Sequence, residues 1–174
     1  MTQISAQQRF ASVRARLEEL GLWDENALVM SAPGAVYSAA GEPVTTELFS
    51  AVSAPMAVLT AGRYAREFVR NPHALRAETD DAAQMFGVRV PVRSAPRRGD
   101  AACIVPGTGF IVTARFENEL IAACILLEKL SMTAQLSHRI GTPKPLGAPL
   151  CLMEHAVYTK KYSRPSLAAA QGEE

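Results

Sequence analysis

One segment of the chain places two hydroxyls and a carboxylate side by side. In "TTELFSAVSA", Thr45 and Thr46 precede Glu47, and the pattern predicts a helix that begins at a threonine cap. Hydroxyls and backbone amides at a helix start suit an anion, and a carboxylate with a raised pKa can act there as an acid or base. The same residues also perform an ordinary structural task, because threonine caps a helix and glutamate complements its dipole. From these residues alone, both interpretations stay open.

A second segment, "IVPGTGFIV", predicts two short buried strands joined through Gly107, Thr108 and Gly109. A Gly-x-Gly sequence lets the backbone turn tightly and lets a ligand or another strand approach closely. On local evidence alone, the simpler interpretation is a hairpin turn whose threonine points wherever it fits.

The histidines do not form a recognisable metal site. No two of them stand four residues apart, as helix-borne ligands do, so only the fold or subunit contacts could bring them together. They are His73, His138 and His155. His155 and Tyr158 lie one helical turn apart and could donate protons near a cleft, or could simply pack a terminal helix or a subunit contact. The sequence also contains no P-loop, no GxGxxG motif and no Ser-His-Asp pattern.

The chain has 174 residues, which is the length of one ordinary domain, and 48% of them are apolar. The net charge of +1 gives no indication of a nucleic-acid partner or of an anionic membrane. Three widely spaced cysteines among apolar neighbours predict reduced, buried thiols in a cytoplasmic protein. They are Cys103, Cys124 and Cys151. We expect one domain over residues 1–165 and a disordered tail over residues 166–174.

Predicted helices and strands alternate along the chain. Apolar positions at helical spacing, with caps and glycine or proline stops, predict helices over residues 10–20, 45–54, 62–69, 78–86, 116–139 and 150–158. Short apolar runs predict strands over residues 27–32, 35–43 (including a turn), 56–61, 88–92, 101–106 and 109–114. Because these runs are apolar on both faces, the sheet should be covered by helices on both sides, as in an α/β/α sandwich.

Four motifs occur in the order found in the class II aldolase and adducin-like family. "LVMSAPG" resembles that family's strand with a Pro-x-Gly-like turn, and "VTTEL" resembles its Ser-Ser-Glu-like helix start. "AVLTAG" takes the place of a valine-rich strand with a His-x-His pair. "IVPGTGFIV" takes the place of an Asn-His-Gly hinge, and "LLEKL" resembles the Leu-Glu pair of the helix that follows. The resemblance covers residues 28–141 and implies a single-domain α/β/α sandwich with a central, largely antiparallel sheet.

The resemblance implies ligand-binding and catalytic roles for four residues. Thr45 and Thr46 match the hydroxyl pair that helps to hold a substrate phosphate, and Gly34 matches the glycine whose backbone N–H joins them. Glu47 matches the glutamate that moves the substrate proton in the family's aldolases. We therefore expect an anion-accepting corner in which Glu47 is the catalytic candidate.

The family's metal ligands are absent from the matching positions. Its three histidines, which hold a divalent metal, fall on Leu59, Ala61 and Thr108. Leucine and alanine have no donor atom, and a threonine hydroxyl is a poor ligand for zinc, so we expect no metal and no other cofactor here. Thr108 is then expected to contact a ligand directly. The family's Gly-Asn-Ile-Ser-like strand, with its ligand-contacting asparagine, is also expected to be missing upstream of "SAPG".

Three hypotheses stay open for the function. The first is a divergent aldolase-like protein without the metal site, which binds a small anion or hydroxy acid or is a non-catalytic oligomeric member. The second is a metal-independent aldolase (lyase) or epimerase-like enzyme that uses Glu47 as acid or base on a small hydroxy acid or sugar phosphate. The third is an unrelated α/β protein. We expect a homo-oligomer, most simply a tetramer, because family members commonly form one and an excess of apolar residues is often buried between subunits.

Overall fold

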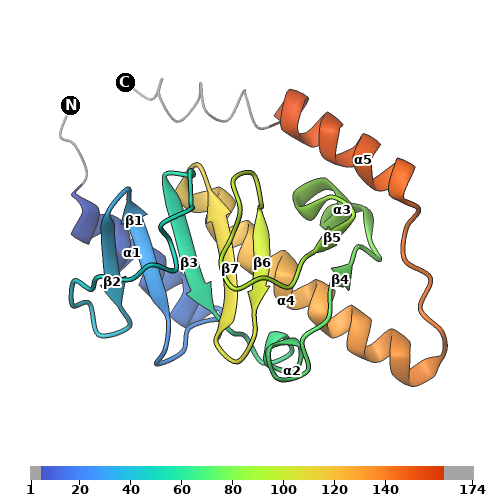
Figure 1. The fold of residues 1–174 in the computed structure, drawn as a ribbon, viewed down its shortest axis with the longest axis horizontal. Helices are drawn as coiled ribbons and strands as arrows, with labels where there is room; N and C mark the ends of the chain where they lie inside the picture. Colours follow the sequence, from blue (N-terminus) through green and yellow to red (C-terminus); the bar gives the residue numbers. More distant parts are fainter. Residues whose placement is uncertain (1–4, 163–174) are drawn as a thin grey trace.

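In a computed structural model of the chain, which describes residues 5–162, five strands form a central sheet (Figure 1). The strand order is β2-β1-β3-β7-β6, and every neighbouring pair is antiparallel. The five strands are β1 (Leu28–Ala32), β2 (Ala35–Ser38), β3 (Met56–Thr60), β6 (Ala102–Val105) and β7 (Gly109–Ala114). The expected α/β fold with a central, largely antiparallel sheet is confirmed. The expected tail over residues 166–174 lies outside the described residues.

The helices and a second, two-stranded sheet complete the architecture. The helices are α1 (Ala6–Glu19), α2 (Ala65–Arg70), α3 (Asp80–Phe86), α4 (Glu117–Ile140) and α5 (Ala148–Val157), which continues into a π-helical turn, η1 (Tyr158–Tyr162). The small sheet pairs β4 (Leu75–Arg76) with β5 (Arg89–Val90). Strand β5 is shorter than the predicted strand over residues 88–92, because Pro91 has no N–H to donate to a neighbouring strand.

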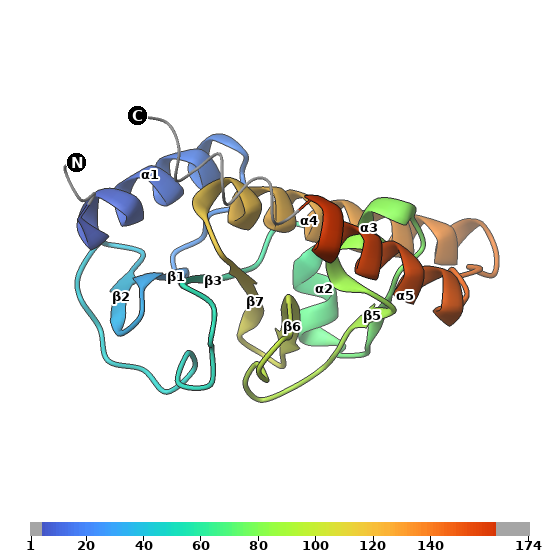
Figure 2. The same ribbon diagram turned by 90° about the horizontal axis from the view of Figure 1, so that it is seen from above.

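Two faces of the sheet carry alternate side chains of the same strands. Val58 and Val112 belong to the apolar cluster on one face, whereas Leu59 and Ile111 belong to the cluster on the other. Figure 2 shows α1, α3, α4 and α5 on one side of the sheet, and the segment of residues 39–55 on the other. Phe49 of that segment is buried in the second cluster. The strands are therefore apolar on both faces because a helical layer covers one and an irregular segment covers the other.

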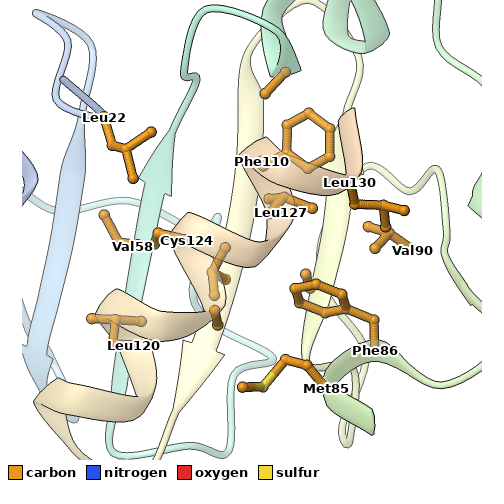
Figure 3. Close-up of a cluster of buried hydrophobic side chains, with 14 of the residues drawn as sticks. Leu22, Val58, Met85, Phe86, Val90, Phe110, Leu120, Cys124, Leu127 and Leu130 are labelled. Atoms are coloured by element: carbon orange, nitrogen blue, oxygen red, sulfur yellow. The ribbon is translucent and has the colours of Figure 1, made fainter. Parts of the chain in front are cut away.

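The long helix α4 supplies the centre of the helix-side core. It crosses behind β7 (Figure 1), and its side chains Leu120, Leu127 and Leu130 are buried among those of the sheet and of α3 (Figure 3). By length and composition alone α4 could cross a membrane, since its most apolar window has a mean hydropathy of 1.4. Packing on the sheet accounts for this apolar character, because one face of α4 belongs to the core.

The predicted helix over residues 45–54 is wrong. The segment forms only turns, in which Ser50 N donates to Glu47 O (3.0 Å) and Val52 N donates to Phe49 O (3.0 Å). The Thr46 hydroxyl accepts a hydrogen bond from Leu48 N (3.2 Å), a local bond that competes with helix formation. The segment lies on the sheet face opposite the helical layer and buries Phe49 there.

Candidate functional site

A cavity of about 560 Å³ lies at the end of the sheet where β3 stops and β7 starts. The register pairs Thr60 with Phe110, so the residue after β3, Ala61, lies beside the turn between β6 and β7. The cavity is lined by Asp24, Glu25, Asn26, Ala61, Arg66, Val69, Arg70, Gly107 and Thr108. Two of the three positions that match metal ligands in the aldolase-like resemblance, Ala61 and Thr108, therefore lie in one cavity.

Each of the two glycines in the turn between β6 and β7 is required by the backbone, for a different reason. Gly107 has a φ of +70°, a backbone conformation that L side chains rarely adopt, and its N–H donates to Val69 O (3.1 Å). A Cβ on Gly109 would lie 3.1 Å from Thr60 O, so this glycine allows β7 to approach β3. Thr108 between them is exposed, and its hydroxyl makes only a long contact of 3.4 Å with Pro106 O. Its side chain has no backbone constraint of the kind that fixes the two glycines.

Asp24 connects the loop between α1 and β1 to the end of β3 by hydrogen bonds. Asp24 Oδ2 accepts a hydrogen bond from Ala61 N (3.2 Å), and Asp24 Oδ1 accepts one from Asn26 N (2.8 Å). The Thr60 hydroxyl donates to the Leu22 carbonyl on the same loop. These bonds hold Asp24 and Asn26 at the cavity and direct both Asp24 oxygens toward backbone N–H groups, which partly compensates the carboxylate charge.

Helix α2 brings two arginines to the cavity. Arg66 and Arg70 are four residues apart on α2, and both also line an adjoining cavity of about 380 Å³. The start of α2 is held by Glu128 of α4, whose carboxylate accepts hydrogen bonds from Tyr64 N (2.7 Å) and Ala65 N (3.1 Å). The positions of both arginines therefore depend on a carboxylate more than fifty residues further along the chain.

The other residues that the sequence nominated lie elsewhere. Because β1 pairs Leu28 with Leu59 and Met30 with Ala57, the turn with Gly34 after β1 is at the opposite end of the sheet from Ala61. The chain after β2 folds back along that strand, with Val44 N bonded to Val36 O (2.9 Å), so residues 45–47 continue toward the Gly34 end.

Thr45 and Glu47 are exposed, and Thr46 is half-buried beside its turn. None of these three residues lines the cavity of Ala61 and Thr108. The structure thus separates Thr108 from Gly34, Thr45, Thr46 and Glu47, and the ligand roles of those four stay predictions.

Sequence reasoning missed Asn26, Arg66 and Arg70. The expectation that the family's Gly-Asn-Ile-Ser-like strand and its asparagine are missing stays a prediction, and Asn26, two residues before β1, lines the cavity from the loop after α1. The available signal was the Asp-x-Asn sequence directly before an apolar strand, which is typical of a turn that fixes a polar group at a strand start. No local signal could have found the arginines, because their placement depends on the contact of α2 with α4.

The residues present do not fit the metal of the aldolase-like family. Leu59 is buried against Ile111 on the loop side of the sheet, Ala61 carries no donor atom, and Thr108 offers a single hydroxyl. His73 stacks on Phe68 with ring centroids 4.9 Å apart and does not line the cavity. Across residues 5–162, no three histidine, cysteine or acidic side chains come close enough to hold a metal ion.

All three cysteines are buried, and burial lowers the reactivity of two of them. Burial raises the pKa of the Cys103 thiol to about 11, with a further contribution from the nearby Asp100 carboxylate. Burial alone raises the pKa of the Cys124 thiol to about 12. Cys151 is also fully buried and unpaired. Since the thiolate is the reactive form, the first two thiols are not nucleophiles at neutral pH.

The antiparallel five-stranded sheet with its helical layer is an aldolase-like α/β fold. L-fuculose 1-phosphate aldolase superposes with a TM-score of 0.71 at 13% identity, covering 91% of this chain and 98% of that one. YgbL from Klebsiella pneumoniae, a candidate aldolase, epimerase or decarboxylase, superposes with a TM-score of 0.61 at 15% identity, covering 87% and 99% of the two chains. The L-fuculose-1-phosphate aldolase of Thermus thermophilus gives a TM-score of 0.56 at 19% identity, covering 80% and 96%.

Only the comparison of structures finds proteins similar to this chain. No family profile matches the chain, and no curated protein matches its sequence. The resemblance to the class II aldolase and adducin-like family is thus confirmed at the level of the fold.

Proposed function

We propose that this protein binds a small anionic or hydroxy-acid ligand in the cavity of Asn26, Ala61, Arg66, Arg70 and Thr108, without the family's metal. The observation that carries the proposal is that arginines line this cavity, while two of the positions that match the family's metal-binding histidines have no imidazole. Two arginines from α2 line it, while Ala61 and Thr108 stand at positions that the resemblance assigns to imidazoles. Guanidinium groups bind carboxylates and phosphates through paired hydrogen bonds and supply the positive charge that a metal would otherwise bring.

The charges around the cavity favour an anion. Within the described part of the chain, Arg66 and Arg70 enter no ion pair, although Arg66 Nε donates to Ala61 O (3.2 Å). Both oxygens of Asp24 accept hydrogen bonds from backbone N–H groups, so this carboxylate repels an anion less than a free one would. Glu25 opposes binding, so we expect an affinity in the millimolar range, which corresponds to about 4 kcal/mol.

The alternative of a metal-independent aldolase, lyase or epimerase gains no specific support. Glu47, its acid or base, is exposed on a turn and does not line this cavity. A proton-transferring carboxylate must come within hydrogen-bond reach of the bound substrate. A non-catalytic ligand-binding role is therefore the better proposal.

We also propose a soluble, cytoplasmic homo-oligomer, most simply a tetramer. Exposed apolar side chains near the end of α4 and on α5 support assembly, since Ile140 is 88% exposed, Leu152 59% and Met153 55%. Clustered exposed apolar side chains commonly mark a protein–protein contact.

Calorimetric titration with inorganic phosphate and with glycolate tests the proposed site. Arg70→Gln should weaken binding about tenfold, because one charge-assisted hydrogen bond contributes roughly 1.5–3 kcal/mol. Ala61→Met should narrow the cavity at the end of β3 and weaken binding. The matched control is Arg76→Gln, an exposed arginine on β4 that does not line the cavity.

Two further variants separate this cavity from the corner predicted by sequence. If the ligand instead sits at residues 45–47, Thr46→Val should weaken binding, and Glu47→Gln should strengthen it by removing a like charge. In that case Arg70→Gln and Arg76→Gln would behave alike, and the proposal for the cavity would be wrong.

A further inference from the structure

A second cavity, of about 400 Å³, lies at the opposite end of the sheet. The register pairs Met56 with Ala114, so this cavity is where β3 starts and β7 stops. Its wall combines residues of the 52–55 segment and of α3 with the chain after β7 and the C-terminal helix. Gly34 and residues 45–47, to which the aldolase-like resemblance assigns ligand roles, lie toward the same end of the sheet but do not line this cavity, and the proposed function does not use it.

Both acids in the wall are already neutralised by arginines. Glu119 is buried, and its carboxylate accepts hydrogen bonds from Arg115 Nη2 (2.6 Å) and from Arg115 N (2.8 Å). Asp100 forms an ion pair with Arg93, with Nε and Oδ2 2.9 Å apart. The guanidinium of Arg97 also reaches the cavity and enters no ion pair among residues 5–162. The lining residues alone carry two positive and two negative charges, and Arg93, which pairs with Asp100 from outside the lining, brings the sum to one positive charge.

The histidine and tyrosine that stand one turn apart in the sequence both line this cavity. His155 Nδ1 lies 2.7 Å from the Gln84 carbonyl oxygen. Because a carbonyl oxygen only accepts, Nδ1 carries the proton, and in the neutral ring Nε2 is left as an acceptor. No bond to Nε2 or to the Tyr158 hydroxyl occurs within the described residues. Burial and the Glu119 carboxylate raise the pKa of Tyr158, against the opposing effect of Arg115, so its hydroxyl stays a donor at neutral pH.

The opposite wall is largely apolar. Val52, Ala54, Pro55 and Met85 contribute apolar side chains to the lining, and Ser53 is the polar residue among them. A ligand that fits must therefore have a polar end with an anionic group and a hydroxyl, and an apolar body. A cavity of this size lies within the range of small-molecule sites.

We propose that this second cavity binds a small hydroxy carboxylate with an apolar body. The ligand's carboxylate accepts a hydrogen bond from the Tyr158 hydroxyl and lies near the positive charges of Arg115 and Arg97. The ligand's own hydroxyl donates to His155 Nε2. The apolar body contacts Ala54 and Met85, where it removes apolar surface from water.

Three probe compounds test each part of this assignment, with affinities measured on the full-length protein by ligand-observed NMR. Mandelate carries the carboxylate, the hydroxyl and a phenyl ring. Mandelamide lacks the charge and phenylacetate lacks the hydroxyl, and each should bind about tenfold more weakly if it loses one charge-assisted or buried hydrogen bond. Equal affinities for mandelate and mandelamide would overturn the proposal.

Two pairs of variants locate the binding. Ala54→Phe should obstruct the cavity and remove mandelate binding there, whereas Ala51→Phe, on the same segment but exposed and outside the cavity, should not. Tyr158→Phe should weaken binding about tenfold, whereas Tyr37→Phe, a half-buried tyrosine of β2, should leave it unchanged. If Ala54→Phe binds mandelate as strongly as Ala51→Phe, the cavity is not the site.

The two proposed cavities can fail separately. Because the proposed function also gives the first cavity a hydroxy-acid ligand, the readout is the part of mandelate binding that Ala54→Phe removes. Arg70→Gln should leave that part unchanged, because Arg70 lies at the other end of the sheet. A mandelate affinity that falls in Arg70→Gln and persists in Ala54→Phe would place this ligand in the first cavity and refute the second.

Discussion

The glycine before α2 offers a sharp test of how the arginine-bearing helix is held. A Cβ on Gly62 would come within 2.6 Å of the Glu128 Cδ and closer still to one carboxylate oxygen. Real Cβ atoms do not approach so closely, so in Gly62→Ala the carboxylate must leave. It then loses its hydrogen bonds from Tyr64 N (2.7 Å) and Ala65 N (3.1 Å).

The cost follows from these two bonds. Each is a bond to a charged acceptor, which contributes roughly 1.5–3 kcal/mol when its partners are buried. Glu128 is only half-buried and the freed N–H groups can reach water, so we expect Gly62→Ala to lower the free energy of unfolding by about 2–3 kcal/mol. For a chain of this size, that corresponds to a fall in melting temperature of about 4–12 °C.

A double-mutant cycle measured by urea unfolding separates this mechanism from a general intolerance of alanine. Glu128→Ala should cost about as much as Gly62→Ala, because it removes the same two bonds. In the Glu128→Ala background, Gly62→Ala should cost about zero, since the clashing carboxylate is gone and alanine restricts the unfolded chain. Gly141→Ala is the matched control, because a Cβ there meets nothing within 4 Å and φ is not in the left-handed region. Equal costs for Gly62→Ala in both backgrounds would refute the reasoning.

Further predictions concern metal, thiols and assembly. Elemental analysis of untagged protein should find no stoichiometric zinc, manganese or iron, and one tightly bound ion per chain would contradict the metal-free proposal. Cys103 and Cys124 should resist a thiol reagent at pH 8 until the protein unfolds, because their raised pKa values of about 11 and 12 keep them protonated. Their unfolded forms ionise first, so the free energy of unfolding should fall as pH rises from about 9 toward 11, and a rise there would be inconsistent with these shifts. Light scattering should give an oligomer, and a clean 18.7 kDa monomer would exclude the proposed assembly.

Much of the fold could be predicted from the apolar pattern. The predicted strands over residues 56–61 and 109–114 became β3 and β7, and the long helix predicted over residues 116–139 became α4. These elements are fully committed to the core, so their periodicity reports burial directly. The error over residues 45–54 has the opposite cause. A threonine before a glutamate predicts a helix cap, but the need to bury Phe49 on the sheet and the local bond of Thr46 outweigh that weak propensity.

The site was less predictable because its members meet through contacts that are remote in sequence. Thr108 and Ala61 could be nominated through the aldolase-like resemblance, and each lies next to a strand, Ala61 directly after β3 and Thr108 directly before β7. Arg66 and Arg70 reach the same cavity only because Glu128 fixes the start of α2. Local spacing within α2 gives no indication of that contact.

The turn between β6 and β7 keeps its two glycines for reasons that belong to the backbone. A metal-binding origin for a Gly-x-Gly turn would suggest that the glycines serve the ligand, but here each has a reason that belongs to the backbone. Gly107 adopts a positive φ, and Gly109 lets β7 lie against Thr60 O. Both constraints hold whatever the cavity binds, so the glycines report the fold alone. The exposed Thr108 between them has no such constraint, and its identity is the part of the motif that reports the chemistry of the cavity.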